Sequence, residues 1–151
     1  MNKFIKVLKV IINIFLIIII VLLSIYAILR FTNRVEIYKV QTGSMEQGIH
    51  VGDYILIVRK NDYNENDIVT YKKDGYHITH RIIKIDGDKV ITKGDANNIE
   101  DEEISKSDIV GKLIYKGGIL NIIVKYKFII IGVFIILYLI TMLFDKEEKE
   151  A

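Results

Sequence analysis

Residues 10–29 read VIINIFLIIIIVLLSIYAIL, a run of 20 residues without a charge. A second uncharged run, FIIIGVFIILYLITMLF, occupies residues 128–144 and is 17 residues long. A helix needs about 20 apolar residues, within a range of about 17–25, to cross the hydrocarbon core of a bilayer. Both runs meet this requirement. The sequence therefore predicts two transmembrane helices and excludes a purely soluble protein.

The first apolar run follows a basic segment, residues 1–9, which contains three lysines. A cleaved signal peptide has an apolar region of about 7–15 residues that ends at a small-x-small site. The longer run here predicts an uncleaved anchor instead. Because positive charge favours the cytoplasmic side, we expect residues 1–9 in the cytoplasm and residues 30–127 outside it. The second helix would then return the chain, leaving residues 145–151 (DKEEKEA) as a charged tail.

Composition narrows the function of the middle section. The whole chain has 151 residues and a net charge of +2, and residues 30–127 carry 16 basic and 15 acidic side chains. This balance gives no support to a nucleic-acid binder, which needs a basic surface to follow the phosphates. Cysteine is absent, which excludes disulfides, thiolate metal sites and a cysteine nucleophile. Proline is absent as well, so turns depend on Gly, Asn and Asp.

Between the two apolar runs the sequence has the composition and the alternation of β-strands. Two Asp-Gly pairs, at residues 74–75 and 86–87, follow strand-like segments and predict tight hairpin turns, because glycine readily adopts positive φ. Gly117-Gly118 predicts a hinge into the second helix. The predicted fold is mainly β, a small antiparallel sheet or barrel flanked by two transmembrane α-helices. Its strands are expected at residues 35–40, 54–58, 68–71, 76–85, 89–92 and 109–115.

Two segments could supply a nucleophile and a base. Ser44 lies in the turn TGSME, residues 42–46, where a hydroxyl is exposed and backbone N–H groups can converge on one point, as acyl transfer requires. His80 lies on the strand expected at residues 76–85, and strand periodicity puts it on the more apolar face. There it could act as a general base or be an ordinary hydrogen-bonded interior histidine.

A third segment is the polar loop TKGDANNIED, residues 92–101, which carries Asp95 and Asp101. It could be a solvated acidic turn or a weak cation site, although it lacks the ligand spacing of an EF-hand. Alternatively, it supplies an acid that orients the histidine. Serine, histidine and aspartate from the three segments together would provide the nucleophile, base and orienting group of a catalytic triad.

Four motifs in this order resemble the type I signal peptidases. They are TGSME at residues 42–46, GD at 52–53, THRII at 79–83 and TKGDANNIED at 92–101. Specifically, they resemble the endoplasmic-reticulum-type branch, which is found in eukaryotes, archaea and some Gram-positive bacteria. The larger bacterial branch has a lysine base before the arginine of the third motif, whereas this chain has His80 there.

The resemblance implies a serine endopeptidase in which Ser44 attacks the scissile carbonyl and His80 takes its proton. Asp101 would orient His80, and Asp95 would be a second acid in the site. The Ser44 N–H and the Thr42 hydroxyl would form the oxyanion hole. No metal and no cofactor are implied. The family usually has proline after Ser-Met-Glu, where this chain has Gln47.

The resemblance also implies the partners and the location. The substrates would be the signal peptides of secreted or membrane precursor proteins, bound as an additional β-strand. The protein would be integral to the cell membrane, in contact with the lipid bilayer and with its catalytic domain on the extracytoplasmic face. Nucleic acid is not an expected partner, and accessory subunits remain an open question.

Two alternatives stay open on the sequence alone. One is a Ser–Lys peptidase, in which Lys72, Lys73 or Lys93 replaces His80 as the base. The other is a non-catalytic, membrane-tethered β module that presents a binding surface. The Ser–Lys alternative predicts that His80→Ala retains substantial activity while one Lys→Ala variant loses it. The separation between the Ser44 hydroxyl and the His80 ring discriminates between the triad and the non-catalytic module.

Overall fold

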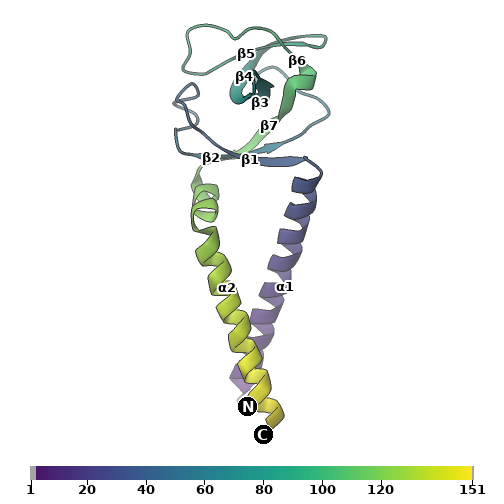
Figure 1. The fold of residues 1–151 in the computed structure, drawn as a ribbon, viewed down its shortest axis with the longest axis vertical. Helices are drawn as coiled ribbons and strands as arrows, with labels where there is room; N and C mark the ends of the chain where they lie inside the picture. The colour runs from purple at the N-terminus through teal and green to yellow at the C-terminus, as the bar shows by residue number, and fades with distance from the viewer. Residues whose placement is uncertain (1–2, 151) are drawn as a thin grey trace. The chain divides into compact units, whose positions relative to one another are not determined.

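A computed structural model describes residues 3–150 and the side chains of residues 6–143. Residues 1, 2 and 151, at the ends of the predicted basic segment and charged tail, lie outside the described residues. Figure 1 shows the elements in chain order. They are α1 Lys3–Phe31, β1 Val35–Lys39, β2 Tyr54–Val58, β3 Ile68–Lys73, β4 Tyr76–Asp86, β5 Lys89–Lys93, β6 Ile104–Ser105, the 3₁₀ turn η1 Lys106–Asp108, β7 Ile109–Lys116 and α2 Gly118–Glu150.

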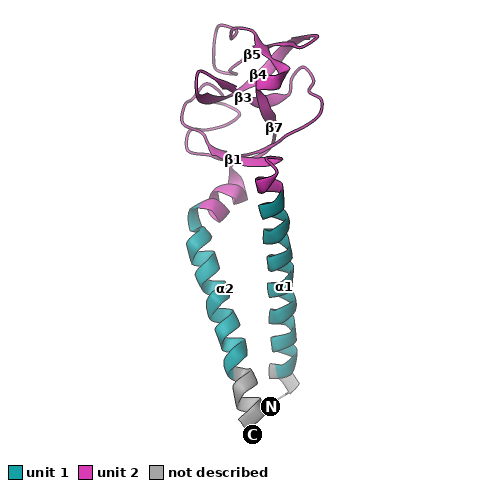
Figure 2. Ribbon diagram, turned by 45° about the vertical axis from the view of Figure 1, so that its right-hand side comes forward, with its two compact units in different colours: residues 1–28, 125–151 teal, residues 29–124 magenta. Residues whose placement is uncertain are grey.

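The chain divides into two compact units, coloured separately in Figure 2. One unit contains most of α1 and α2, from residues 1–28 and 125–151, and the rings of Phe15 and Phe134 lie 6.0 Å apart in it. Both helices are long and apolar enough to cross a membrane, at Lys6–Phe31 and Gly118–Leu143. The mainly β fold with two flanking apolar helices is therefore as predicted.

The second helix, α2, begins before the uncharged run from which it was predicted. The uncharged run starts at residue 128, whereas α2 starts at Gly118. Lys125 and Lys127 lie before the uncharged run and limit its length. Because lysine is a good helix former, the helix itself extends through both residues. The first residues of α2, 118–124, belong to the same compact unit as the sheet.

The second unit, residues 29–124, is built on one antiparallel sheet. Its strand order is β1-β2-β7-β3-β4-β5-β6, so the last strand of the chain lies between β2 and β3. Both predicted hairpins are present, β3–β4 and β4–β5. In the first, Asp74 and Gly75 both have positive φ, 51° and 81°, which a two-residue type I′ turn requires.

One strand is missing from the sequence prediction. The two-residue strand β6, Ile104–Ser105, pairs with β5 and leads into η1. It follows the acidic run of residues 100–103, which has the composition of a loop. Strands this short are set by their partner rather than by their own pattern, so the sequence offers little to identify them.

The apolar side chains of the sheet form two clusters. One surrounds β3, β4 and β5, and the other packs the segment after β1 against β2. The first cluster, here called the β4 cluster, contains Tyr63, Val69, Tyr71, Ile82, Val90, Ile104 and Ile109. The second, here called the β2 cluster, contains Met45, Ile49, Ile55 and Ile57.

Gly111 allows β7 to approach β2 closely. A Cβ atom at this position would lie 2.7 Å from the backbone carbon and oxygen of Val58, which is below any normal contact distance. The backbone would have to move, so we expect Gly111→Ala to lower the free energy of unfolding by about 1–3 kcal/mol. Thermal unfolding of the purified protein in detergent measures the effect.

Gly132 provides the matched control. A Cβ atom there meets nothing within 4 Å, and the residue lies inside α2. Because alanine favours a helix over glycine, Gly132→Ala should not lower the melting temperature. Equal losses in both variants would contradict the steric explanation for Gly111.

Candidate active site

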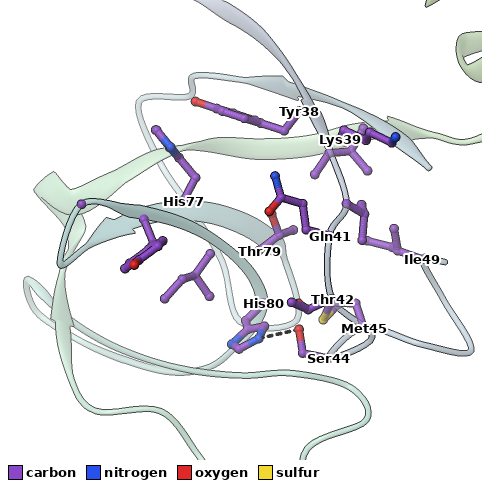
Figure 3. A pocket seen from close by; sticks show the side chains of 15 residues that line it. Tyr38, Lys39, Gln41, Thr42, Ser44, Met45, Ile49, His77, Thr79 and His80 are labelled. Atoms are coloured by element: carbon purple, nitrogen blue, oxygen red, sulfur yellow. Dashed lines mark hydrogen bonds between the residues drawn. The ribbon is translucent and has the colours of Figure 1, made fainter. Parts of the chain in front are cut away.

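Ser44 is held by the buried residues that follow it. Met45 and Ile49 are almost completely buried in the β2 cluster and bracket a turn stabilised by the Ile49 N–H, which donates to the Met45 carbonyl at 2.8 Å. The Ser44 carbonyl accepts a hydrogen bond from the Ala96 N–H at 2.9 Å. The hydroxyl points toward His80 (Figure 3).

Gly94 makes the approach of these two segments possible. A Cβ atom on Gly94 would lie only 2.6 Å from the Ser44 carbonyl oxygen. The glycine of the fourth motif therefore has a steric reason: only a residue without a side chain lets the loop of residues 94–101 pack on the serine backbone.

His80 projects from the middle of β4 toward Ser44. Its Nε2 lies 3.0 Å from Ser44 Oγ, the contact drawn as a dashed line in Figure 3. The residue is 6% exposed, and its ring contacts the Tyr71 ring edge-on with centroids 6.4 Å apart. His80 and Ile82 are buried while Arg81 is not, so strand periodicity correctly predicted the more apolar face.

Asp101 lies on the opposite side of the imidazole. Its Oδ2 atom is 2.5 Å from His80 Nδ1. The same oxygen accepts hydrogen bonds from the Thr92 hydroxyl at 2.7 Å and the Tyr71 hydroxyl at 3.3 Å. The backbone is fixed too, because the Asp101 N–H donates to the Thr92 carbonyl at 2.8 Å.

These contacts define the roles of the two ring nitrogens. An ionised carboxylate only accepts hydrogen bonds, so His80 Nδ1 must be the protonated nitrogen that donates to Asp101. Nε2 is then left with a lone pair facing the Ser44 hydroxyl. Burial, with a contribution from the negative charge of Asp101, raises the pKa of Tyr71 to about 12, so this phenol remains a donor.

Asp95, the second acid expected in the site, pairs with Arg81, whereas Asp101 pairs with His80. Its carboxylate forms a bidentate pair with Arg81, at 2.9 Å from Nε and 2.8 Å from Nη2, and among the described residues it makes no hydrogen bond with His80. Arg81 also donates to the Asn66 carbonyl at 2.9 Å. The hydrogen bond from Arg81 holds the pKa of Asp95 below its ordinary value. The backbone N–H of Asp95 lies 3.4 Å from the Met45 sulfur, so the backbone of this residue contacts the turn that carries Ser44.

The two predicted oxyanion donors lie beside the nucleophile. Thr42 lines the same pocket as Ser44, and Figure 3 shows its side chain next to Ser44 and His80. Within the described part of the chain, neither the Ser44 N–H nor the Thr42 hydroxyl has a hydrogen-bond acceptor. Both groups are therefore available to donate a hydrogen bond to a ligand.

A groove of about 630 Å³ leads away from Ser44 between the segment at residues 38–42 and the first half of β4. Its lining is largely apolar, with Val40, Ile49 and Ile78 among the contributors. Tyr38 and His77 also line it, and their rings are in contact, with centroids 4.7 Å apart and planes tilted by 33° (Figure 3).

The lysines considered as alternative bases have other environments. Lys73 Nζ pairs with Glu102 at 2.5 Å, and this hydrogen bond holds its pKa above the ordinary value, the opposite of what a base requires. Lys72 is exposed on β3, and Lys93 lies opposite Arg81 on β5. Among residues 6–143, the basic group in contact with Ser44 Oγ is His80.

No group of three or more His, Cys, Asp or Glu side chains among the described residues is arranged to hold a metal ion.

The supporting roles of Tyr71, Thr92 and Arg81 were missed from the sequence. Thr92 and Arg81 at least lie inside the third and fourth motifs, whereas nothing in the pattern distinguishes Tyr71 from a core tyrosine.

Gln47 has a backbone conformation that proline cannot adopt. Its φ is +76°, whereas the proline ring fixes φ near −65°. The departure from the family pattern therefore comes with a left-handed backbone conformation at this position. We expect Gln47→Pro to lower the melting temperature, whereas Gln47→Gly should leave it unchanged or raise it, because left-handed backbone costs a non-glycine residue about 1 kcal/mol. A more stable Gln47→Pro variant in thermal unfolding would contradict this backbone assignment.

Comparisons with known proteins agree with the motifs. The Peptidase S24-like family model matches residues 24–114. The chain is 33% identical over 121 residues to the signal peptidase complex catalytic subunit SEC11C of Homo sapiens, covering 64% of this chain and 63% of that protein. It is 32% identical over 95 residues to the subunit SEC11 of Metarhizium acridum, covering 52% and 55%. The match thus spans less than two thirds of these relatives. Since the family model covers more than half of the chain, the protein belongs to the Peptidase S24-like family, and its predicted similarity to the endoplasmic-reticulum-type signal peptidases is confirmed.

Proposed function

We propose that the protein is a membrane-bound serine endopeptidase that removes signal peptides from exported precursor proteins. The observation that carries the proposal is the continuous hydrogen-bonded line from Ser44 Oγ through His80 to Asp101, with separations of 3.0 Å and 2.5 Å. The similarity to proteins named signal peptidase catalytic subunits supports the substrate class.

In this mechanism Ser44 Oγ forms a bond to the carbonyl carbon of the scissile peptide while its proton passes to His80 Nε2. Asp101 stabilises the imidazolium that results, and the Ser44 N–H and Thr42 hydroxyl donate to the oxyanion. The imidazolium then gives its proton to the leaving amine, and the C–N bond breaks. A water molecule, deprotonated by His80, hydrolyses the acyl-enzyme and frees Ser44.

The edges of the sheet support an extended substrate. β5 pairs with β4 only from Arg81 to Asp86, which leaves the side of residues 76–80 away from β3 without a strand partner in the described sheet. β1 is the terminal strand of the same sheet. The groove lies between these two open edges, so a peptide can join them by main-chain hydrogen bonds and place a carbonyl near Ser44.

The proposed location follows from the two apolar helices. Signal peptides are themselves membrane segments, and an enzyme held at the bilayer meets them by diffusion in two dimensions. We place the catalytic unit on the extracytoplasmic face of the cell membrane, where a translocated precursor exposes its cleavage site.

Asp95 has a supporting part in this proposal: through Arg81 it positions the loop that contacts the serine backbone.

Substitution of the three triad residues tests the proposed function. We expect Ser44→Ala and His80→Ala to lower the rate of precursor cleavage by at least about 10⁴-fold, and Asp101→Ala by at least about 10³-fold, because the groups act as a unit. The measurement is cleavage of a model precursor by the full chain reconstituted in lipid vesicles.

Ser107→Ala is the matched control, because its hydroxyl lies in the exposed turn η1. It should cleave at the wild-type rate. Near-wild-type cleavage by Ser44→Ala would refute the serine mechanism. Loss of activity in a lysine variant but not in His80→Ala would support the Ser–Lys alternative instead.

A further inference from the structure

The junction between β7 and α2 contacts the segment that carries the nucleophile, although the two are far apart in the sequence. This segment, residues 43–53, is here called the nucleophile loop. The first turns of α2 belong to the same compact unit as the sheet, as the magenta start of that helix shows in Figure 2. Contacts between them are therefore internal to one unit.

Asn121 is the central side chain of this junction. Its Nδ2 donates to Asp53 Oδ1 at 2.8 Å, and its Oδ1 accepts from the Tyr54 N–H at 2.7 Å. Asp53 in turn uses its other oxygen, Oδ2, to accept from the His50 N–H at 3.1 Å. The hydrogen bond from Asn121 is the largest cause that holds the pKa of Asp53 below its ordinary value. One amide thus fixes the carboxylate that closes the nucleophile loop.

Two further contacts hold the same segment. The Lys116 ammonium donates to the Gly48 carbonyl. Gly117, with φ of +54°, packs so closely that a Cβ atom there would lie 3.1 Å from Asp53 Oδ1. The junction therefore contacts both the middle and the end of the nucleophile loop.

The backbone of Asp53 extends this support to the groove. The Val40 N–H donates to the Asp53 carbonyl at 2.8 Å, and the Gly52 N–H donates to the Val40 carbonyl at 2.9 Å. Val40 lines the groove and leads directly into the turn of Ser44. Residues on both sides of the nucleophile are consequently attached to Asp53.

We propose that Asn121 is a positioning residue that acts through Asp53 to hold the nucleophile loop in its reactive geometry. The start of the second apolar helix then belongs to the catalytic framework, in addition to any role of the helix in the membrane. The physical reason is that a nucleophile on a loop needs a supporting shell, since a displacement of about 1 Å can cost about 10²-fold in rate. This inference rests on the proposed peptidase function.

An exchange of the two side chains provides a sharp test. Asn121→Asp removes the donor to Asp53 and sets two carboxylates against each other. Asp53→Asn leaves either the His50 N–H or Asn121 without its correct partner. In the double variant, the new amide at position 53 can donate to the new carboxylate at position 121 and accept from the His50 N–H. The carboxylate at position 121 also accepts from the Tyr54 N–H, so all three hydrogen bonds are restored.

The full chain is assayed for precursor cleavage in vesicles. We expect each single variant to lower kcat by about tenfold or more with little change in KM, and the double variant to recover most of the loss. Asn61→Asp, at an exposed position away from the junction, controls for the added charge and should retain the wild-type kcat. A double variant no more active than the singles, or a wild-type kcat in Asn121→Asp, would overturn the proposal.

Hydrogen exchange separates this inference from the proposed function. The His50 and Tyr54 amides should exchange about tenfold faster in each single variant and regain protection in the double variant, whether or not any precursor is cleaved. If the wild type cleaves nothing, the proposed function fails, and unchanged exchange would reject the role of Asn121 separately. If Asn121→Asp does not fold, Gly117→Ala, which pushes on the same carboxylate, must accelerate exchange at the His50 amide, and normal protection there would reject the proposal.

Discussion

In the proposed mechanism, the reactivity of the site depends on one carboxylate oxygen. Oδ2 of Asp101 receives the Thr92 hydroxyl, the Tyr71 hydroxyl and His80 Nδ1 within 2.5–3.3 Å. Tyr71 on β3 and Thr92 on β5 are both buried, so the carboxylate cannot rotate without breaking hydrogen bonds to donors that have no water to replace it. The orientation of the imidazole, and with it the lone pair that faces Ser44, follows from this one fixed oxygen.

The proposed nucleophile, Ser44, belongs to the other half of the sheet unit. Ser44 is attached to the β2 cluster through Met45, whereas His80 and Asp101 are attached to the β4 cluster. The loop at residues 94–98 joins the two halves, since the Ala96 N–H donates to the Ser44 carbonyl and Asp95 pairs with Arg81 on β4. Preorganisation of the triad thus follows from packing on both sides and a polar connection between them.

Much of this arrangement could be predicted from the sequence because it depends on local pattern. Alternation along residues 76–85 put His80 on the buried face, the Asp-Gly pairs gave the hairpins, and long uncharged runs gave the helices. The motifs brought Ser44, His80 and Asp101 together, but several other contacts between distant residues could not be predicted. Nothing near Asp95 in the sequence indicates that it pairs with Arg81, and nothing near Asn121 indicates that it binds a residue 68 positions earlier.

The tautomer of His80 is the most direct test of this account. Ring nitrogen-15 NMR of the full chain, with His80 assigned by comparison with His80→Ala, distinguishes a protonated from an unprotonated nitrogen. If Asp101 orients the ring, neutral His80 carries its proton on Nδ1, and Nε2 is unprotonated and able to accept from Ser44. A proton on Nε2 in the neutral wild-type protein would contradict the account, because the nitrogen that faces the serine could then not act as its base.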